Sequence, residues 1–126
     1  MFSKKFFLIL ISALFLASCF SSVTSELKDN YSSGKISELQ YYQGMYDYIR
    51  EEGSASTRAS WMKYYNHMIQ LTKLKRSRAI SDADYRSELT KADIFKAEIE
   101  AVESAEDRAR WQSMARGFKC MTLDGC

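Results

Sequence analysis

The side chains that most often carry out catalysis or bind metals are few in this chain of 126 residues, which has one histidine, His67, and three cysteines, Cys19, Cys120 and Cys126. A zinc site needs about four ligands, and these four residues do not have a zinc-binding spacing. The sequence also lacks the nucleophile-elbow, zinc-protease and glycine-rich phosphate-binding motifs. We therefore expect no catalytic site, no metal and no cofactor, and an enzyme is the least favoured class of function.

The first 18 residues have the anatomy of a secretory signal peptide. Lys4 and Lys5 give a positively charged start, and residues 6–17 are apolar except for Ser12. A membrane-spanning helix needs roughly 20 apolar residues, so this run is too short to cross a bilayer. Residues 1–18 are therefore predicted to be cleaved from the mature protein.

The apolar run ends in Leu16-Ala17-Ser18-Cys19, which resembles the lipobox of bacterial lipoproteins. This resemblance implies that a dedicated signal peptidase cleaves just before Cys19. It also implies that the thiol carries a thioether-linked diacylglycerol and that the new amino group is often acylated as well. Each buried methylene contributes about 0.8 kcal/mol, so two or three acyl chains hold a protein on a membrane essentially permanently. The alternatives are an ordinary secretory peptide with a chance cysteine, or an uncleaved N-terminal helix.

The residue after the cysteine bears on which membrane would hold the protein. Phe20 stands where enterobacterial lipoproteins of the inner membrane carry an aspartate, so the resemblance implies transport to the outer membrane. Residues 19–25 would form the lipidated cysteine and a short tether, which keeps the following part of the chain close to the bilayer. Residues 26–126 are predicted to form a single helical domain.

The two other cysteines lie close together at the C-terminus. Once Cys19 is assigned to the lipid, Cys120 and Cys126 remain as an even pair in an oxidising compartment. Gly125, which lies between them, gives the backbone the freedom to close a small ring. We predict a disulfide between Cys120 and Cys126 that closes the C-terminal tail. Because its loop is so short, this disulfide would add little stability through chain entropy.

Two segments of the domain share a pattern at an offset of 44 residues, namely Ile36-Ser37 followed by Tyr41 and Ile80-Ser81 followed by Tyr85. Serine hydroxyls accept hydrogen bonds from N–H groups of a first helical turn, so both serines are predicted helix N-caps and not nucleophiles. The isoleucine and the tyrosine of each segment stand at the two positions of a hydrophobic staple.

Apolar residues at spacings of three and four predict four helices, over residues 24–32, from 38 to about 52, from about 56, and from 82 to about 117. Gly117 is the predicted C-cap of the last helix. The sequence contains no proline and no strand-like alternation of apolar and polar residues. The predicted fold is all-α, a small bundle of three to four helices built from helical hairpins.

The charges of the chain are unevenly distributed along its length. The formal charge of +2 belongs wholly to the predicted signal peptide, whose removal leaves equal numbers of acidic and basic residues. Residues 53–81 hold six basic and no acidic residues, whereas residues 82–107 hold nine acidic and three basic residues. The favoured interpretation is an antiparallel hairpin in which the two helices neutralise each other. The alternative is that the basic segment binds an anionic lipid headgroup or a glycan.

A candidate binding surface follows from the aromatic and basic residues of the second and third predicted helices. The tyrosines of the second helix fall on more than one of its sides, so some of them should be exposed. The surface is predicted to include Tyr41, Tyr48, Trp61, Arg76 and Arg78.

The predicted function is that of a lipid-anchored lipoprotein of the bacterial cell envelope, at the outer membrane, that acts by binding. Its partners would be the membrane, through the lipid on Cys19, and an envelope protein whose complex it assists or modulates. Nucleic acid is not an expected partner outside the cytoplasm, and the oligomeric state stays open. In size, lipobox and lack of catalytic residues, the chain resembles the small plasmid- or phage-borne lipoproteins that block entry of related DNA. The alternatives are a module that binds an envelope glycan or an anionic lipid, and an inhibitor of a periplasmic enzyme.

Overall fold

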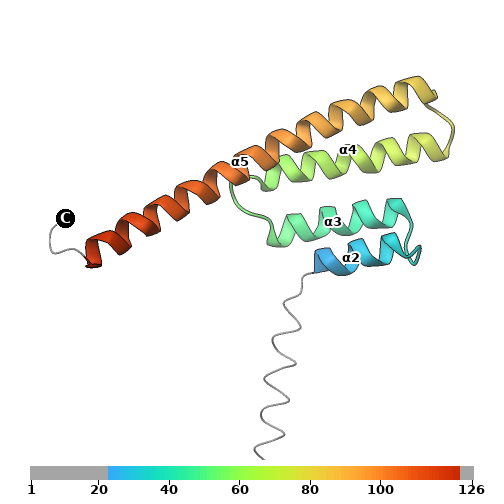
Figure 1. The fold of residues 1–126 in the computed structure, drawn as a ribbon. Helices are drawn as coiled ribbons and strands as arrows, with labels where there is room; N and C mark the ends of the chain where they lie inside the picture. The colour runs from blue at the N-terminus through green and yellow to red at the C-terminus, as the bar shows by residue number, and fades with distance from the viewer. Residues whose placement is uncertain (1–22, 123–126) are drawn as a thin grey trace, which may run out of the picture.

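The computed structural model describes residues 23–122 and shows within this range four helices and no strand (Figure 1). The helices are α2 (Val23–Ser32), α3 (Glu38–Glu52), α4 (Arg58–Arg76) and α5 (Asp82–Thr122). The predicted all-α fold and the four predicted helices are therefore confirmed. The predicted signal peptide, Cys19 and Cys126 lie outside the described residues, as does the side chain of Cys120, so the predicted disulfide stays a prediction.

The four helices stack in chain order, each antiparallel to the next (Figure 1). Helix α3 packs between α2 and α4, and α5 packs on the far side of α4. Over residues 23–122, no close backbone approach joins α2 to α4 or α5, or α3 to α5. Short connections make consecutive helices antiparallel neighbours, and this produces an open stack of hairpins instead of a closed bundle.

Helix α2 is the outermost element and has no buried residue of its own. It is held against α3 at Gly44, where an added Cβ would lie 2.7 Å from Cδ2 of Leu27. The missing side chain of Gly44 is what lets Leu27 approach the α3 backbone and join the partly buried layer around the core.

Helix α2 ends in a Schellman motif. Gly34 has a φ of 76°, in the left-handed region that favours glycine. Its N–H donates to the Tyr31 carbonyl at 3.0 Å, and the N–H of Lys35 donates to the Asn30 carbonyl at 2.8 Å. The helix end predicted at residue 32 thus has a specific hydrogen-bonded form.

Helix α4 ends in the same motif, 44 residues later. The N–H of Arg78 donates to the Lys75 carbonyl at 3.1 Å, and the N–H of Ala79 donates to the Leu74 carbonyl at 2.9 Å. The residue in the position of Gly34 is Arg78, whose φ is 57°. The predicted repeat is therefore a repeated helix-to-helix connection, except that arginine replaces glycine at the left-handed residue.

We expect Arg78→Gly to raise the free energy of unfolding by about 0.5–1 kcal/mol. A left-handed conformation costs a non-glycine residue about 1–2 kcal/mol, part of which is offset because glycine loses more conformational entropy on folding. Urea denaturation followed by circular dichroism measures the change. Arg76→Gly is the matched control, since Arg76 is helical and glycine costs about 1 kcal/mol in a helix. Equal destabilisation by both substitutions would contradict the assignment of strain to position 78.

Both helices that follow these connections begin at the predicted serine caps. Gln40 N–H donates to Ser37 Oγ at 3.2 Å, and Ser37 N–H donates to Gln40 Oε1 at 2.8 Å, which completes a capping box before α3. Before α5, Asp84 N–H donates to Ser81 Oγ at 3.1 Å, and the Ser81 hydroxyl donates to the Asp84 carboxylate at 2.7 Å. The prediction that both serines are caps is confirmed.

The core lies mainly along α4, which packs against helices on both sides. Its buried cluster consists of Met45, Tyr64, Tyr65, Met68, Leu71, Ala92 and Ile99. A chain of aromatic rings runs through this layer and includes a stacked contact between Trp61 and Tyr65, with ring centres 5.8 Å apart. The aromatic residues at helical spacing are therefore largely core residues.

Burial raises the pKa of four tyrosines in this layer above the ordinary value, namely Tyr41, Tyr42, Tyr64 and Tyr65. An unfolded tyrosine ionises at a pKa of about 10. Because the raised folded pKa favours the protonated form, the resulting stability is complete below about pH 10 and is lost as pH rises further.

We therefore expect the melting temperature to fall steeply above about pH 10, together with the appearance of tyrosinate absorbance. Thermal melts followed by circular dichroism at a series of alkaline pH values measure this loss. Tyr65→Phe, which removes one of the ionising groups, should show a shallower alkaline fall. Tyrosines that all ionise near pH 10 without unfolding would contradict the expectation.

One prediction about α5 is wrong, and another holds only in part. The helix does not end at Gly117 but continues to Thr122, because good helix formers such as Ala115, Arg116 and Lys119 lie near this glycine and no proline follows it. Helices α4 and α5 form the predicted antiparallel hairpin (Figure 1), but their charges do not pair as expected. Over the described residues, the one charged contact between these helices joins His67 Nε2 to a Glu88 carboxylate oxygen at 3.4 Å. Helix α5 instead presents apolar residues such as Ile99 to α4.

Candidate binding surfaces

The structure does not bring the five predicted surface residues together. Trp61 lies near the start of α4 and Arg76 is its last residue. Fifteen residues of helix separate them, or about 22 Å at 1.5 Å per residue. Because α3 runs antiparallel to α4, Tyr41 lies toward the Arg76 end and Tyr48 toward the Trp61 end (Figure 1). The residues of the predicted single surface therefore lie in two separate regions.

At the Trp61 end, the polar contacts hold the fold together. Trp61 Nε1 donates to Glu103 Oε1 at 2.7 Å, and Thr57 Oγ1 donates to the same oxygen at 2.8 Å. Thr57 is only 2% exposed. Since Thr57 and Trp61 belong to the start of α4, the carboxylate also lies at the positive end of the α4 dipole. This cluster joins α5 to α4, so Trp61 has a structural role here.

Sequence reasoning missed Glu103 and Thr57. Glu103 is one of nine acidic residues in the segment 82–107, and nothing in its spacing distinguishes it from the others, while the third helix is predicted to begin near Ser56. The available signal was a threonine directly before a helix, but Thr57 makes no side-chain cap to its own helix. Its hydroxyl bonds to α5 instead, which only the tertiary arrangement reveals.

Tyr41 is half-buried, and its ring stacks on that of Tyr31 with centres 5.1 Å apart. It belongs to the layer packed against the core and holds α2 to α3. Tyr48 is also partly exposed, near the end of α3. Of these two tyrosines, Tyr48 is the one outside the core layer and therefore the more available for contact with a partner.

The opposite end of the stack is basic. We define the basic end as Lys73, Lys75, Arg76 and Arg78, all of which are exposed. The first three lie in the last turn of α4, where cations are stabilised by the negative end of the helix dipole. The dipole accounts for cations in the last turn but not for Arg78, which lies beyond the helix. Arginine guanidinium groups can bind carboxylate or phosphate oxygens in a bidentate manner.

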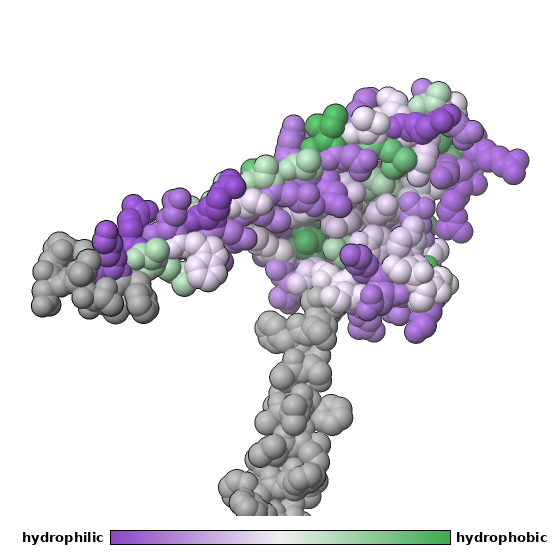
Figure 2. Space-filling view, in the orientation of Figure 1, coloured by the Kyte–Doolittle hydropathy of each residue, from purple (hydrophilic) through white to green (hydrophobic). Residues whose placement is uncertain are grey.

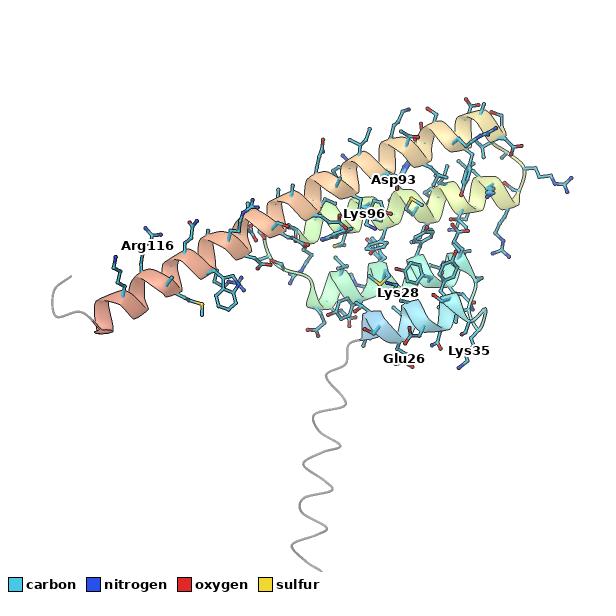
Figure 3. All side chains as sticks on the ribbon, in the orientation of Figure 1. Glu26, Lys28, Lys35, Asp93, Lys96 and Arg116 are labelled. Atoms are coloured by element: carbon cyan, nitrogen blue, oxygen red, sulfur yellow. The ribbon has the colours of Figure 1, made fainter. Side chains whose placement is uncertain are left out.

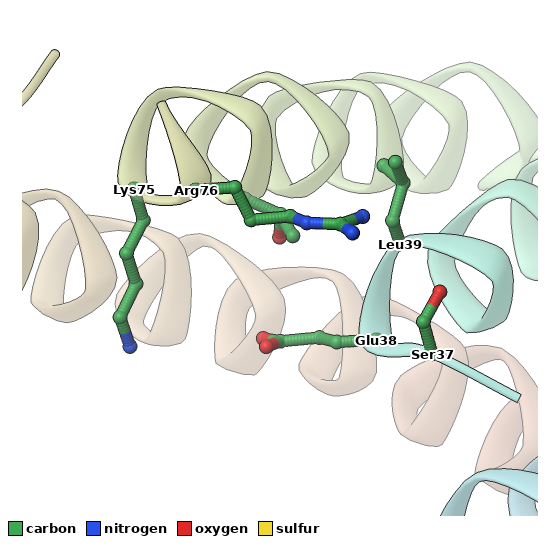
Figure 4. A pocket seen from close by; sticks show the side chains of 6 residues that line it. Ser37, Glu38, Leu39, Lys75 and Arg76 are labelled. Atoms are coloured by element: carbon green, nitrogen blue, oxygen red, sulfur yellow. The ribbon is translucent and has the colours of Figure 1, made fainter. Parts of the chain in front are cut away.

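A shallow groove of about 440 Å³ opens beside the basic end (Figure 4). It lies between the start of α3 and the end of α4 and is lined by Ser37, Glu38, Leu39, Thr72, Lys75 and Arg76. Figure 4 shows Arg76 and Glu38 extending across the opening from the two helices. The groove thus offers a cation and an anion from its two walls beside an apolar residue, Leu39 (Figure 4).

The polar groups of this groove are partly engaged. The Ser37 hydroxyl already accepts the cap hydrogen bond from Gln40, and Lys75 Nζ lies 4.2 Å from the centre of the Tyr85 ring. Arg76 is the strongest remaining cation on the wall of the groove. The arrangement suits electrostatic contact with an acidic group and does not resemble a nucleophile with its base.

A second depression, of about 250 Å³, lies between α4 and α5 and includes His67. Lys91 Nζ contacts Glu88 Oε1 at 2.7 Å, and this hydrogen bond holds the pKa of Glu88 below its ordinary value and raises the pKa of Lys91. His67 lies on the other side of Glu88. A carboxylate kept ionised between two basic groups fits a surface pairing of the two helices better than proton transfer.

Within residues 23–122, no group of three or more histidine, cysteine, aspartate or glutamate side chains is placed to hold a metal ion. None of the helices in that range combines the length and the apolar character required to span a bilayer.

The geometry of the described surfaces is thus a basic end with a groove, a structural cluster at Glu103, and the exposed continuation of α5. In comparisons with known proteins, no family model, no curated protein and no solved structure matches the chain.

Proposed function

We propose that the protein is a lipid-anchored lipoprotein of the bacterial cell envelope, at the outer membrane, and that it acts by binding an envelope protein. The observation that supports anchoring is the lipobox-like sequence ending in Cys19, four residues before α2 begins at Val23. A tether this short would hold the helical stack against the bilayer surface. Within this class, blocking the entry of related DNA is the specific role suggested by resemblance.

The anchor is tested by Cys19→Ala in the native envelope. The variant should move from the membrane fraction to the soluble or secreted fraction, because it can receive no acyl chain. Cys120→Ala is the matched control, since it removes a different cysteine, and it should stay in the membrane fraction. Persistent membrane retention of Cys19→Ala in a carbonate wash would contradict lipid anchoring.

The surface that we propose for the protein partner is the basic end. Its four cations are exposed, and Arg76 and Arg78 can pair with carboxylates of an acidic partner face. Lysine and arginine at such rims mainly set the association rate and the choice of partner, and they add less to affinity.

A photocrosslinking residue at position 76 tests this assignment. It should capture one discrete envelope protein in cells, whereas the same residue at position 28, on the outer helix α2, should not. Equal capture from both positions would contradict the basic end as the contact surface. Capture of a periplasmic hydrolase would indicate the inhibitor alternative.

A glycan is the second candidate ligand, and the groove beside Arg76 favours it. Its mixed wall of Arg76, Glu38 and Leu39 offers polar and apolar contacts to a sugar ring. Double substitution of Arg76 and Arg78 by glutamate should abolish binding to isolated sacculi while leaving helicity unchanged. Unchanged sacculus binding would exclude this candidate.

A further inference from the structure

Helix α5 continues well beyond the stack of helices. Glu103 accepts a hydrogen bond from Trp61 of α4, and Glu106 accepts one from Ser56 just before α4. Beyond these residues the helix continues to Thr122. We define the arm as residues 107–122, which span about 24 Å at 1.5 Å per residue. Figure 1 shows the arm projecting past the start of α4, and Figure 3 places Arg116 on it, away from the other helices.

The arm combines exposed apolar side chains with basic charge. Trp111 is 69% exposed and Met114 is 55% exposed, three residues apart on a helix and therefore on neighbouring positions of one face. Four basic residues accompany them: Arg108, Arg110, Arg116 and Lys119. The sequence contains no acidic residue between Asp107 and Asp124. Figure 2 shows polar side chains along one edge of the arm and paler, more apolar ones along the other.

This composition favours an anionic bilayer over a second copy of the arm as the surface that the arm contacts. A second copy of the arm would bring like charges together and gain little from two apolar side chains. A basic helix with tryptophan on its apolar side is the type that lies in the interface of an anionic bilayer. Tryptophan prefers the headgroup level, where its ring is buried and its N–H stays hydrated.

The position of the arm in the fold agrees with this occupant. Helices α2 and α4 begin at the same end of the stack, and the arm projects from that end (Figure 1). If Cys19 is lipidated, as in the proposed function on which this step rests, the anchor enters the bilayer beside α2 and brings the arm to the same surface. One lipid group and one basic segment are a familiar pair of membrane signals.

We propose that the arm lies on the anionic membrane surface, with Trp111 and Met114 inserted at the headgroup level and the four basic residues contacting lipid phosphates. The arm would then be a second membrane contact that restricts the orientation of the stack, with the axis of α5 (Figure 1) along the bilayer surface.

The experiment reads the arm locally in the full chain. Trp61→Phe leaves Trp111 as the sole tryptophan, since the chain has two. This variant is reconstituted with vesicles of phosphatidylethanolamine and phosphatidylglycerol that carry brominated acyl chains. We expect Trp111 emission to shift to shorter wavelength and to be quenched. Trp111→Phe in the otherwise native chain is the second variant, and its remaining emission, from the half-buried Trp61, should not be quenched.

Charge reversal tests whether the arm binds anionic lipid through its basic residues or binds any bilayer through its apolar side chains. Substitution of the four basic arm residues by glutamate should abolish the quenching, and so should phosphatidylcholine vesicles or high salt. Reversal of the same number of charges at the basic end is the matched control and should leave quenching intact. An unquenched, unshifted Trp111 in chains that co-sediment with anionic vesicles would overturn the proposal. The lipid anchor is tested separately. If Cys19 is lipidated, Cys19→Ala changes the fractionation of the protein in cells and leaves the quenching of Trp111 on vesicles unchanged.

Discussion

Leu71→Ala is expected to lower the free energy of unfolding by about 3–5 kcal/mol. Leu71 is 2% exposed and lies in the cluster at the centre of the stack, on the helix that packs against both neighbours. Truncation removes its transfer free energy and leaves a cavity in the buried cluster. A native domain has a total stability of about 5–15 kcal/mol, so this loss would be a large fraction of the total.

Leu74→Ala is the matched control, on the same helix and three residues further along. Leu74 is 42% exposed, so the same chemical change should cost about 0.5–1 kcal/mol. Urea denaturation with circular dichroism gives both values, and the slope with urea should stay constant between them. Similar losses from the two substitutions would contradict the placement of the core along the inner face of α4.

Glu103→Ala is expected to cost about 2–4 kcal/mol, although glutamate on a helix surface is ordinarily replaceable. One carboxylate oxygen of Glu103 accepts from both Thr57 and Trp61, at 2.8 and 2.7 Å. Hydrogen bonds to a charged group contribute about 1.5–3 kcal/mol, and the substitution leaves the hydroxyl of a buried threonine without its acceptor. The start of α4 should therefore loosen from α5, which hydrogen exchange of the amides around residue 60 would report.

Glu106→Ala is the control for Glu103→Ala. Glu106 accepts one hydrogen bond, from the Ser56 hydroxyl at 2.8 Å, in an exposed setting, so its loss should cost about 0–1 kcal/mol. Glu103→Gln should recover part of the stability, because the amide oxygen can accept from the same donors. A cost for Glu103→Ala no larger than that for Glu106→Ala would show that the cluster does not hold α5 to α4.

The helix boundaries could be predicted because their signals are local. Ser37 and Ser81 each precede a run of helical spacing, and both caps form. Gly34 marks the end of α2 because glycine readily adopts the left-handed conformation, with a φ of 76°, that closes the helix. The equivalent turn at Arg78 carried no such signal, since arginine rarely adopts a left-handed conformation.

The end of α5 could not be predicted in the same way. Glycine is a frequent helix terminator, but Gly117 stays helical, and among the described residues no atom beyond its own stretch of helix lies within 4 Å of the position that a Cβ would take there. Good helix formers nearby, such as Met114, Ala115, Arg116 and Lys119, offset a penalty of about 1 kcal/mol for glycine. Composition alone therefore placed the helix end five residues too early.

The candidate surface shows a different limit of sequence reasoning. Aromatic and basic residues could be recognised as types suited to binding, but their distribution over the stack depends on which helix ends meet. The antiparallel order sends Trp61 and Arg76 to opposite ends of α4, and it brings Thr57 to Glu103 on a helix 46 positions away. Long-range contacts of this kind leave no periodic trace in the sequence.

The arm could be recognised as a candidate surface only from the sequence and the structure together. Its basic residues and Trp111 are visible in the sequence, but only the structure shows that Trp111 and Met114 are exposed on a helix that continues beyond the stack.

The mass of the mature N-terminal peptide, taken from protein purified from its native envelope, is the most direct measurement of the central claim. The account predicts a peptide that begins at Cys19 and carries a diacylglycerol on the sulfur together with a further acyl group on the amine. A peptide that begins at Met1, or one that contains Cys19 with a free thiol, would contradict it.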